Sequence, residues 1–156
     1  MSVRIILVDD HDAIRQALRC ILETESDFET VGEACNGREA IQLVEQLLPD
    51  VVIMDINMPE INGIEATRKI HQFYPNVKVI GYSSHSAKAY VLGMLRAGAS
   101  GYVLKLSHAN ELSEAIRIVL KDQVYMSPSI HGILIEEIRS IDKKKSSMQL
   151  TKLAIE

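Results

Sequence analysis

The stretch Val51-Val52-Ile53-Met54-Asp55 decides how this chain folds, because it joins a buried strand to a carboxylate. Four uncharged residues, three of them β-branched, are typical of a strand that is buried on both faces of a parallel sheet. In open α/β sheets, ligands bind in the crevice beyond the carboxyl ends of such strands. We therefore expect Asp55 to lie at a ligand site that the rest of the chain builds.

The composition is that of an ordinary globular protein. The chain has 156 residues, of which 47% are hydrophobic and 24% charged, and its net charge is −4. This acidic balance argues against extensive contact between this segment and nucleic acid. The sequence shows neither an apolar run of membrane-spanning length nor a signal peptide, so we expect a cytoplasmic protein with no membrane partner. The two cysteines and five histidines lack the spacing of common metal sites.

Apolar runs alternate with helical stripes along most of the chain. Strands are expected at residues 3–8, 28–35, 51–54, 77–82 and 101–104, and an amphipathic helix is expected after each. Five strands that alternate with five helices through short loops imply parallel βαβ units with right-handed crossovers. The fold class is therefore α/β, with a doubly wound five-stranded parallel sheet in a domain over residues 1–121.

The remainder of the chain differs in character. Residues 122–150 are expected to be a linker with a short helix at about 129–140, because the segment 142–147 is polar and charged, as flexible linkers are. Residues 151–156 become helix-like again but cannot form a core alone. They are either the start of a second domain that has been cut off or a remnant of a vector.

Polar side chains occur at the expected carboxyl ends of four strands. They are Asp9, Asp10, Asp55, Ser83 and Lys105. Because the carboxyl ends of parallel strands open on the same edge of a sheet, these groups should share one crevice. Three carboxylates in one crevice require a compensating cation. Ligation by oxygen alone favours Mg²⁺, with the backbone carbonyl of Asn57 as a further ligand.

This set of groups fits phosphoryl transfer to a carboxylate. A carboxylate such as Asp55 can accept a phosphoryl group to form an acyl phosphate. The transfer requires positive charge near the phosphoryl oxygens, which Mg²⁺ and Lys105 would supply, and the Ser83 hydroxyl could donate a hydrogen bond. Each residue alone has an ordinary explanation as a helix cap, a turn former or a surface charge. Their coincidence at one edge of the sheet favours the phosphoacceptor interpretation.

Three stretches resemble the response-regulator receiver domain, in particular the subfamily with a C-terminal LuxR-type helix-turn-helix (NarL/FixJ-like). They are residues 6–11, ILVDDH, 52–63, VIMDINMPEING, and 97–105, AGASGYVLK. The resemblance covers residues 3 to about 121 and implies a flavodoxin-like receiver fold with strand order 2-1-3-4-5. The pair Leu150-Thr151 resembles the entry into the helix-turn-helix, so residues 151–156 would be the start of a truncated domain of that type unless they derive from a vector.

The resemblance further implies a role for each residue of the site. Asp55 would accept a phosphoryl group from the phosphohistidine of a sensor histidine kinase. Asp9, Asp10, Asp55 and the Asn57 carbonyl would bind Mg²⁺, and Lys105 would contact the phosphoryl group. Ser83 and Tyr102 would be the switch residues.

The expected output is a conformational switch in a two-component system rather than turnover as an enzyme. Phosphoryl uptake and autodephosphorylation would be self-catalysed. The switch would control homodimerisation and the regulation of transcription, with DNA bound only through a C-terminal domain that this segment lacks.

Three other functions involve similar residues. A haloacid-dehalogenase-like aspartyl phosphatase would require a second acid two residues after the nucleophile, where this chain has Asn57. A flavodoxin-like flavin-binding protein would require a phosphate loop after the first strand, where Asp9 and Asp10 would instead repel phosphate. A receiver that switches without phosphorylation stays open at this point.

Overall fold

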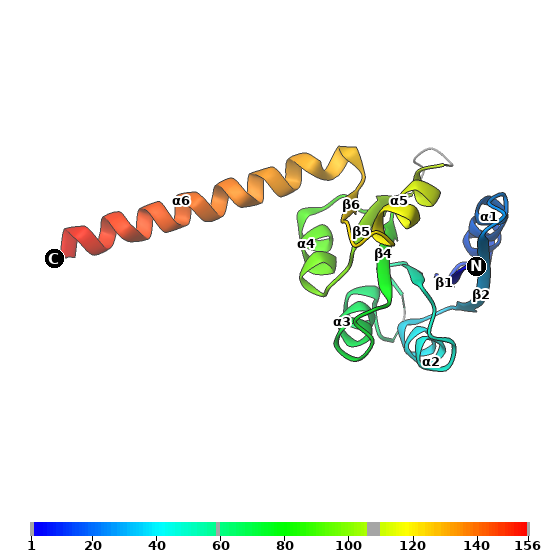
Figure 1. Ribbon diagram of the computed structural model, residues 1–156. Coiled ribbons are helices and arrows are strands. Elements are labelled where there is room, and N and C mark those ends of the chain that lie inside the picture. The colour runs from blue at the N-terminus through cyan, green and yellow to red at the C-terminus, as the bar shows by residue number, and fades with distance from the viewer. Residues whose placement is uncertain (1, 59, 106–109, 156) are drawn as a thin grey trace. The chain divides into compact units, whose positions relative to one another are not determined.

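The computed structural model describes residues 2–58, 60–105 and 110–155, with side chains described as far as Met148 (Figure 1). The chain divides into two compact units, residues 1–126 and 127–156.

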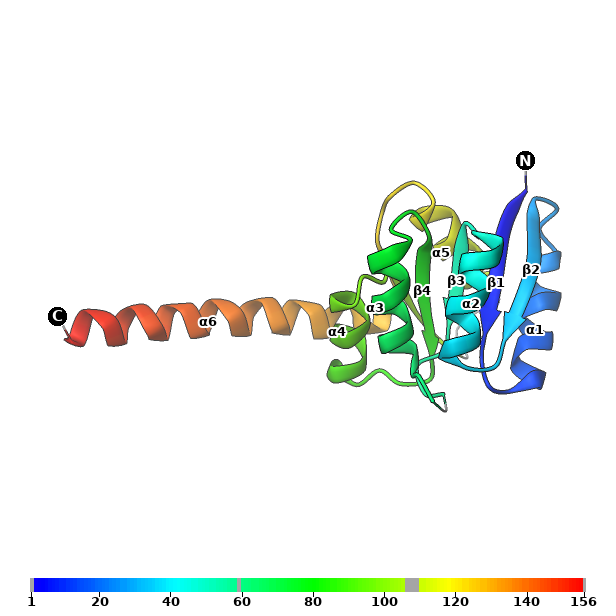
Figure 2. The ribbon, with the colours of Figure 1, turned by 90° about the horizontal axis from the view of Figure 1, so that it is seen from below.

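The first unit is built on one parallel sheet. Its strands are β1 (Val3–Val8), β2 (Phe28–Ala34), β3 (Val51–Met54), β4 (Lys78–Ser83), β5 (Gly101–Leu104) and β6 (Tyr125–Met126). They lie in the order β2-β1-β3-β4-β5-β6, and all neighbouring pairs are parallel. Figure 2 shows β2, β1, β3 and β4 side by side. The predicted α/β class and the predicted order of the first five strands are therefore confirmed.

Helices cover both faces of this sheet (Figure 1). They are α1 (Asp12–Glu23), α2 (Gly37–Leu47), α3 (Gly63–Phe73), α4 (Lys88–Arg96) and α5 (Glu111–Val119). One core cluster joins α1 and α5 to the same face of the strands, where Leu18 and Ile116 pack with Ile5 and Ile53. All four residues of β3 are buried, as expected for a central strand covered on both sides.

The sixth strand corrects the prediction of five. β6 pairs with β5 through two positions, Gly101 with Tyr125 and Tyr102 with Met126. The Tyr125 N–H also donates to the Ser100 carbonyl at 3.1 Å. Two residues are too few to show the alternation by which a strand is recognised in a sequence.

The second unit consists of a 3₁₀ turn (Pro128–Ile130) and the helix α6 (His131–Ile155). A helix was expected at about 129–140, but the polar segment 142–147, expected to be a flexible linker, is also helical. The sequence from 133 to 156 contains no glycine or proline and is rich in Lys, Glu and Ile, so nothing in it ends the helix. The division into a linker at 122–150 and a further domain from 151 stays a prediction. Within the described residues, no helix combines the length and the apolar character needed to cross a bilayer.

Candidate functional site

The strand order brings three sequence-predicted residues into direct contact. Asp9 follows β1, Asp55 follows β3 and Lys105 follows β5, so all three lie at the carboxyl edge of the sheet. The Lys105 Nζ atom is 2.8 Å from Asp9 Oδ2 and 3.4 Å from Asp55 Oδ1. Lys105 therefore links acids that are 96 and 50 residues away in the sequence.

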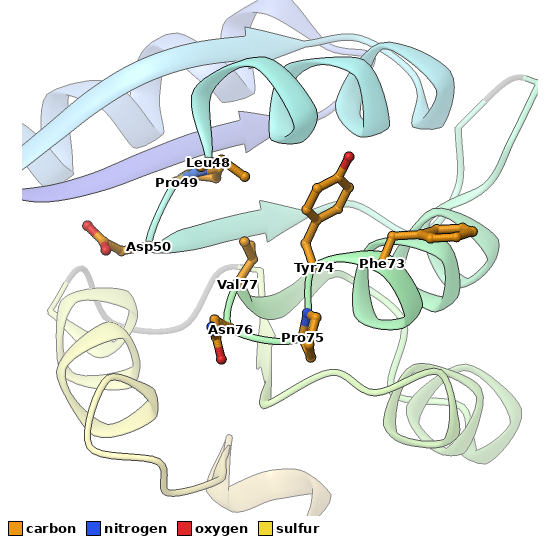
Figure 3. A pocket seen from close by; sticks show the side chains of 8 residues that line it. All are labelled: Leu48, Pro49, Asp50, Phe73, Tyr74, Pro75, Asn76 and Val77. Carbon is orange, nitrogen blue, oxygen red and sulfur yellow. The ribbon is translucent and has the colours of Figure 1, made fainter.

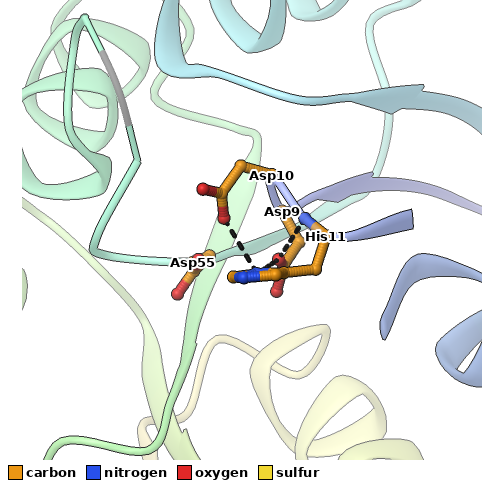
Figure 4. Close-up of side chains that lie close together, drawn as sticks. All are labelled: Asp9, Asp10, His11 and Asp55. Carbon is orange, nitrogen blue, oxygen red and sulfur yellow. Dashed lines mark hydrogen bonds and ion pairs between the residues drawn. The ribbon is translucent and has the colours of Figure 1, made fainter. Parts of the chain in front are cut away.

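A fourth group, His11, joins the acids and was missed in the sequence. Ligand atoms of Asp9, Asp10, His11 and Asp55 all lie within 4.8 Å of one another (Figure 4). The His11 Nδ1 atom is 3.0 Å from Oδ1 of Asp9 and 3.0 Å from Oδ1 of Asp10. The only signal for His11 was its position directly after two acids at a strand end, because its spacing matches no histidine-based metal motif.

Burial and mutual repulsion dominate the electrostatics of this cluster. Asp9 and Asp55 are 1% and 6% exposed. Burial raises the pKa of Asp55, the charge of Asp9 raises it further, and the attraction of Lys105 only partly offsets both. Burial alone would lower the pKa of Lys105, but its hydrogen bond to Asp9 and the charges of both acids outweigh burial, so its pKa is raised. The cluster thus holds more negative charge than Lys105 balances.

His11 responds to the same excess of negative charge. The hydrogen bond to Asp9 and then the charge of Asp10 raise the pKa of this exposed imidazole. A divalent cation with oxygen ligands is the type of group that would balance such a cluster.

Close packing fixes the backbone that carries Asp55. The Asp55 N–H donates to the Val8 carbonyl at 2.9 Å, which extends the pairing of β3 with β1. The Gly63 N–H donates to the Ile56 carbonyl at 2.9 Å, and a Cβ atom at Gly63 would lie 2.0 Å from the Asp55 carbonyl oxygen. Asn62 caps α3 by accepting a hydrogen bond from the Glu65 N–H. The start of α3 can therefore rest directly on the Asp55 backbone only because residue 63 has no side chain.

The two predicted switch residues meet through the backbone of His85. The His85 N–H donates to the Ser83 Oγ atom at 3.1 Å, and the Tyr102 hydroxyl donates to the His85 carbonyl at 2.6 Å. Ser83 and Tyr102 are both buried, and Tyr102 is fully enclosed. The loop after β4 is thus tied to a side chain on β5.

The side chain of His85 also reaches the loop after β3. Its Nε2 atom is 2.6 Å from the Asn57 side-chain nitrogen, and its ring lies 4.8 Å from the ring of Tyr90 on α4. Asn57 was expected to act through its backbone carbonyl, so this side-chain contact was not anticipated. A contact between residues that are 28 positions apart has no signal in the local sequence pattern.

A separate cavity lies at the opposite edge of the sheet (Figure 3). Its volume is about 390 Å³, and its lining residues are Leu48, Pro49, Asp50, Phe73, Tyr74, Pro75, Asn76 and Val77. These residues precede β3 and β4, whereas the acid cluster follows the strands. The Asp50 carboxylate already accepts a hydrogen bond from the Arg4 N–H at 2.8 Å. The cavity is therefore distinct from the site around Asp55.

Known proteins share this fold and much of the sequence. A family model described as the response regulator receiver domain matches residues 5–117. The chain is 43% identical over 149 residues to the transcriptional regulatory protein DegU of Brevibacillus brevis, covering 94% of this chain and 63% of that relative. It is 38% identical over 128 residues to the response regulator GacA of Pseudomonas viridiflava, covering 82% of this chain and 60% of that relative.

A solved structure agrees with the two relatives. The crystal structure of a LuxR-family two-component response regulator from Aurantimonas sp. SI85-9A1 superposes with a TM-score of 0.83 at 39% identity, covering 88% of this chain and 98% of that one. The chain spans 63% and 60% of the length of the two curated relatives described above.

Proposed function

This chain belongs to the response regulator receiver family, and from this premise we propose that Asp55 accepts a phosphoryl group from the phosphohistidine of a sensor histidine kinase. The observation that carries the proposal is the contact of Lys105 with both Asp9 and Asp55 at the carboxyl edge of the sheet. In the reaction, an Asp55 carboxylate oxygen bonds to phosphorus as the phosphorus–nitrogen bond breaks, and the imidazole leaves.

The residues of the cluster suit Mg²⁺. Asp9, Asp10 and Asp55 offer carboxylate oxygens within 4.8 Å of one another, and such hard oxygen donors are the preferred ligands of this ion. The Asn57 backbone carbonyl would be a further ligand. When bound, Mg²⁺ would neutralise charge on the phosphoryl oxygens.

Lys105 and Ser83 would act on the phosphoryl group from two sides. The Lys105 ammonium lies 3.4 Å from the Asp55 carboxylate, so it is close enough to pair with a phosphoryl oxygen there. Ser83 would leave its hydrogen bond with the His85 N–H and donate to another phosphoryl oxygen. Because Tyr102 is bound to the carbonyl of His85, a movement of this loop would change the environment of Tyr102.

The signal would then be passed to partners. We expect a shift between two packings of the protein that favours a homodimer of the phosphorylated form. The relative named as a transcriptional regulatory protein supports a role in transcription. DNA would then be bound only through a C-terminal domain outside this segment. Phosphoryl uptake and autodephosphorylation would be the only reactions that the chain catalyses. The family match gives no support to the phosphatase alternative or to a receiver that switches without phosphorylation.

Intact-mass spectrometry after incubation with acetyl phosphate and MgCl₂ tests the proposal. The wild-type protein should gain the mass of one phosphoryl group, and the gain should disappear in Asp55→Ala and when EDTA replaces MgCl₂. Asp10→Asn should require more MgCl₂ for the same gain. An equal gain in the Asp55→Ala protein, or no gain in the wild type, would contradict the assignment.

A further inference from the structure

Arg15 lies next to the acid cluster and contacts three separate elements. Its side chain is only 14% exposed. The Nη1 atom donates to the Asp9 carbonyl oxygen at 2.5 Å, the Nε atom donates to Glu33 Oε1 at 3.1 Å, and the Nη2 atom pairs with the Asp12 carboxylate. One planar group thus joins the end of β1, the strand β2 and the start of α1.

The bond to Asp9 holds the peptide from which the buried carboxylate projects. The Asp9 N–H still follows the pattern of the sheet and donates to the Ala34 carbonyl at 3.1 Å. Beyond Asp9 the chain leaves the sheet, and a buried carbonyl at such a point requires another donor. Arg15 supplies that donor and thereby fixes the peptide plane between Asp9 and Asp10. The directions of both acidic side chains depend on this plane.

We propose that Arg15 is a positioning residue for the divalent cation, and that it acts by holding Asp9 and Asp10 in the geometry that binds the ion. The inference rests on the proposed function, because it assumes that these acids bind Mg²⁺. Arg15 would not touch the ion. It would reduce the loss of conformational freedom when the ligands close around the cation.

The positive charge of Arg15 should weaken Mg²⁺ binding, whereas its support of the turn should strengthen it. The direction in which the Mg²⁺ affinity changes on substitution therefore tests the proposal. A guanidinium close to a cation site repels the cation. If Arg15 acted only through its charge, removing it would therefore strengthen Mg²⁺ binding. If Arg15 acts mainly by holding the turn at Asp9 and Asp10, removing it would weaken Mg²⁺ binding. The two roles therefore predict changes in opposite directions for Arg15→Ala.

Arg15→Lys separates the two roles further. Lysine keeps the positive charge but replaces the rigid fork of donors by one flexible ammonium, which cannot hold Asp9 and Glu33 together in the same way. If charge alone mattered, Arg15→Lys would bind Mg²⁺ as the wild type does.

Arg19 provides a matched control one turn further along α1. It also pairs with the Glu33 carboxylate, whereas among the described residues the side-chain hydrogen bond to the Asp9 carbonyl comes from Arg15. Arg19→Ala removes the same charge and a bond to the same partner while leaving the Asp9 carbonyl bound.

Isothermal titration calorimetry of the whole 156-residue chain with MgCl₂ tests the proposal. Arg15→Ala and Arg15→Lys should raise the Kd for Mg²⁺ roughly tenfold, as the loss of groups that orient metal ligands does. Arg19→Ala should keep the wild-type Kd or lower it slightly. With acetyl phosphate, the MgCl₂ concentration for half-maximal phosphorylation should shift by the same factor in the Arg15 variants, while the rate at saturating MgCl₂ stays at the wild-type value.

Each other outcome has a defined meaning. A lower or unchanged Kd in either Arg15→Ala or Arg15→Lys would overturn the positioning role, as would equal weakening in Arg19→Ala. A reduced rate at saturating MgCl₂ would also overturn it, because the effect of Arg15 would then extend beyond binding of the ion. If Arg15→Ala fails to fold, as judged by circular dichroism, Arg15→Lys decides alone. A wild-type protein that binds no Mg²⁺ would overturn the proposed function together with this inference, whereas a failure confined to the Arg15 variants would leave the proposed function intact.

Discussion

Gly63→Ala tests how closely α3 rests on the backbone of Asp55. The new Cβ atom would lie 2.0 Å from the Asp55 carbonyl oxygen and 2.8 Å from the Ile56 Cα atom, whereas ordinary contacts begin near 3.4 Å. Because these neighbours are backbone atoms, the start of α3 must retreat by more than an ångström. The retreat would also break the 2.9 Å hydrogen bond from the Gly63 N–H to the Ile56 carbonyl.

The expected loss of stability follows from three terms. Overpacking costs about 1–3 kcal/mol, the lost hydrogen bond costs about 1 kcal/mol, and the better helix propensity of alanine returns at most about 1 kcal/mol. The free energy of unfolding should therefore fall by about 2 kcal/mol. Urea denaturation followed by circular dichroism measures this quantity. The rate of phosphorylation by acetyl phosphate should also fall, because the retreat of α3 removes the support of the Asp55 backbone.

Gly132→Ala is the matched control for this change. It lies in α6, and a Cβ atom there would meet nothing within 4 Å, so the substitution should increase helicity without strain. A Gly63→Ala protein whose free energy of unfolding lies within about 0.5 kcal/mol of the wild-type value would refute the reasoning, since that is the range of changes at uncrowded surface sites. Equal destabilisation by both substitutions would show that the contact with Asp55 is not the cause.

Three further substitutions probe the site and the core. Asp55→Asn should stabilise the protein at neutral pH, because the raised pKa of Asp55 means that folding disfavours its charged form. The gain in the free energy of unfolding should be absent below the ordinary pKa of 3.8, grow as the pH rises, and be complete above the folded-state pKa. Urea midpoints measured across this range would contradict the argument if the gain were largest in acid. Tyr102→Phe removes the 2.6 Å hydrogen bond to the His85 carbonyl and should lower the free energy of unfolding by about 1 kcal/mol; an unchanged value would mean that the bond contributes nothing. Thr30→Val should raise the free energy of unfolding by about 1 kcal/mol, because the Thr30 hydroxyl is buried without a hydrogen-bond partner among the described residues; thermal unfolding at the wild-type temperature would indicate that water reaches this hydroxyl.

The sheet and the principal contacts at its edge could be predicted from the sequence because they follow from topology. The run Val51–Met54 is fully buried, as its composition indicates. Once the strands are parallel, residues that follow them must gather at one edge. The contact between Asp9 and Lys105, which are 96 residues apart, can therefore be predicted from the strand topology alone.

Other features could not be predicted, because they depend on loop conformation rather than on periodicity. The contact between Asn57 and His85 requires two loops to bend toward each other. The hydrogen bond from Arg15 goes to the backbone carbonyl of Asp9, and sequence patterns do not predict such side-chain to backbone bonds. The spacing of His11 matches no known metal motif. The polar composition of residues 142–147 indicated a linker, but the segment is helical because it contains no helix-breaking residue.

The short strand β6 limits how a signal can move through this molecule. On one side, Tyr102 pairs with Gly81 of β4, and on the other it pairs with Met126 of β6. The backbone of Tyr102 is therefore clamped between two neighbours and cannot slide or swing outward without breaking both pairings. The response of Tyr102 proposed above would therefore be a rotation of its side chain about the Cα–Cβ bond. In the proposed function, a change at Asp55 would then reach Tyr102 as a turn of one ring, while the strands on either side of β5 keep their pairing.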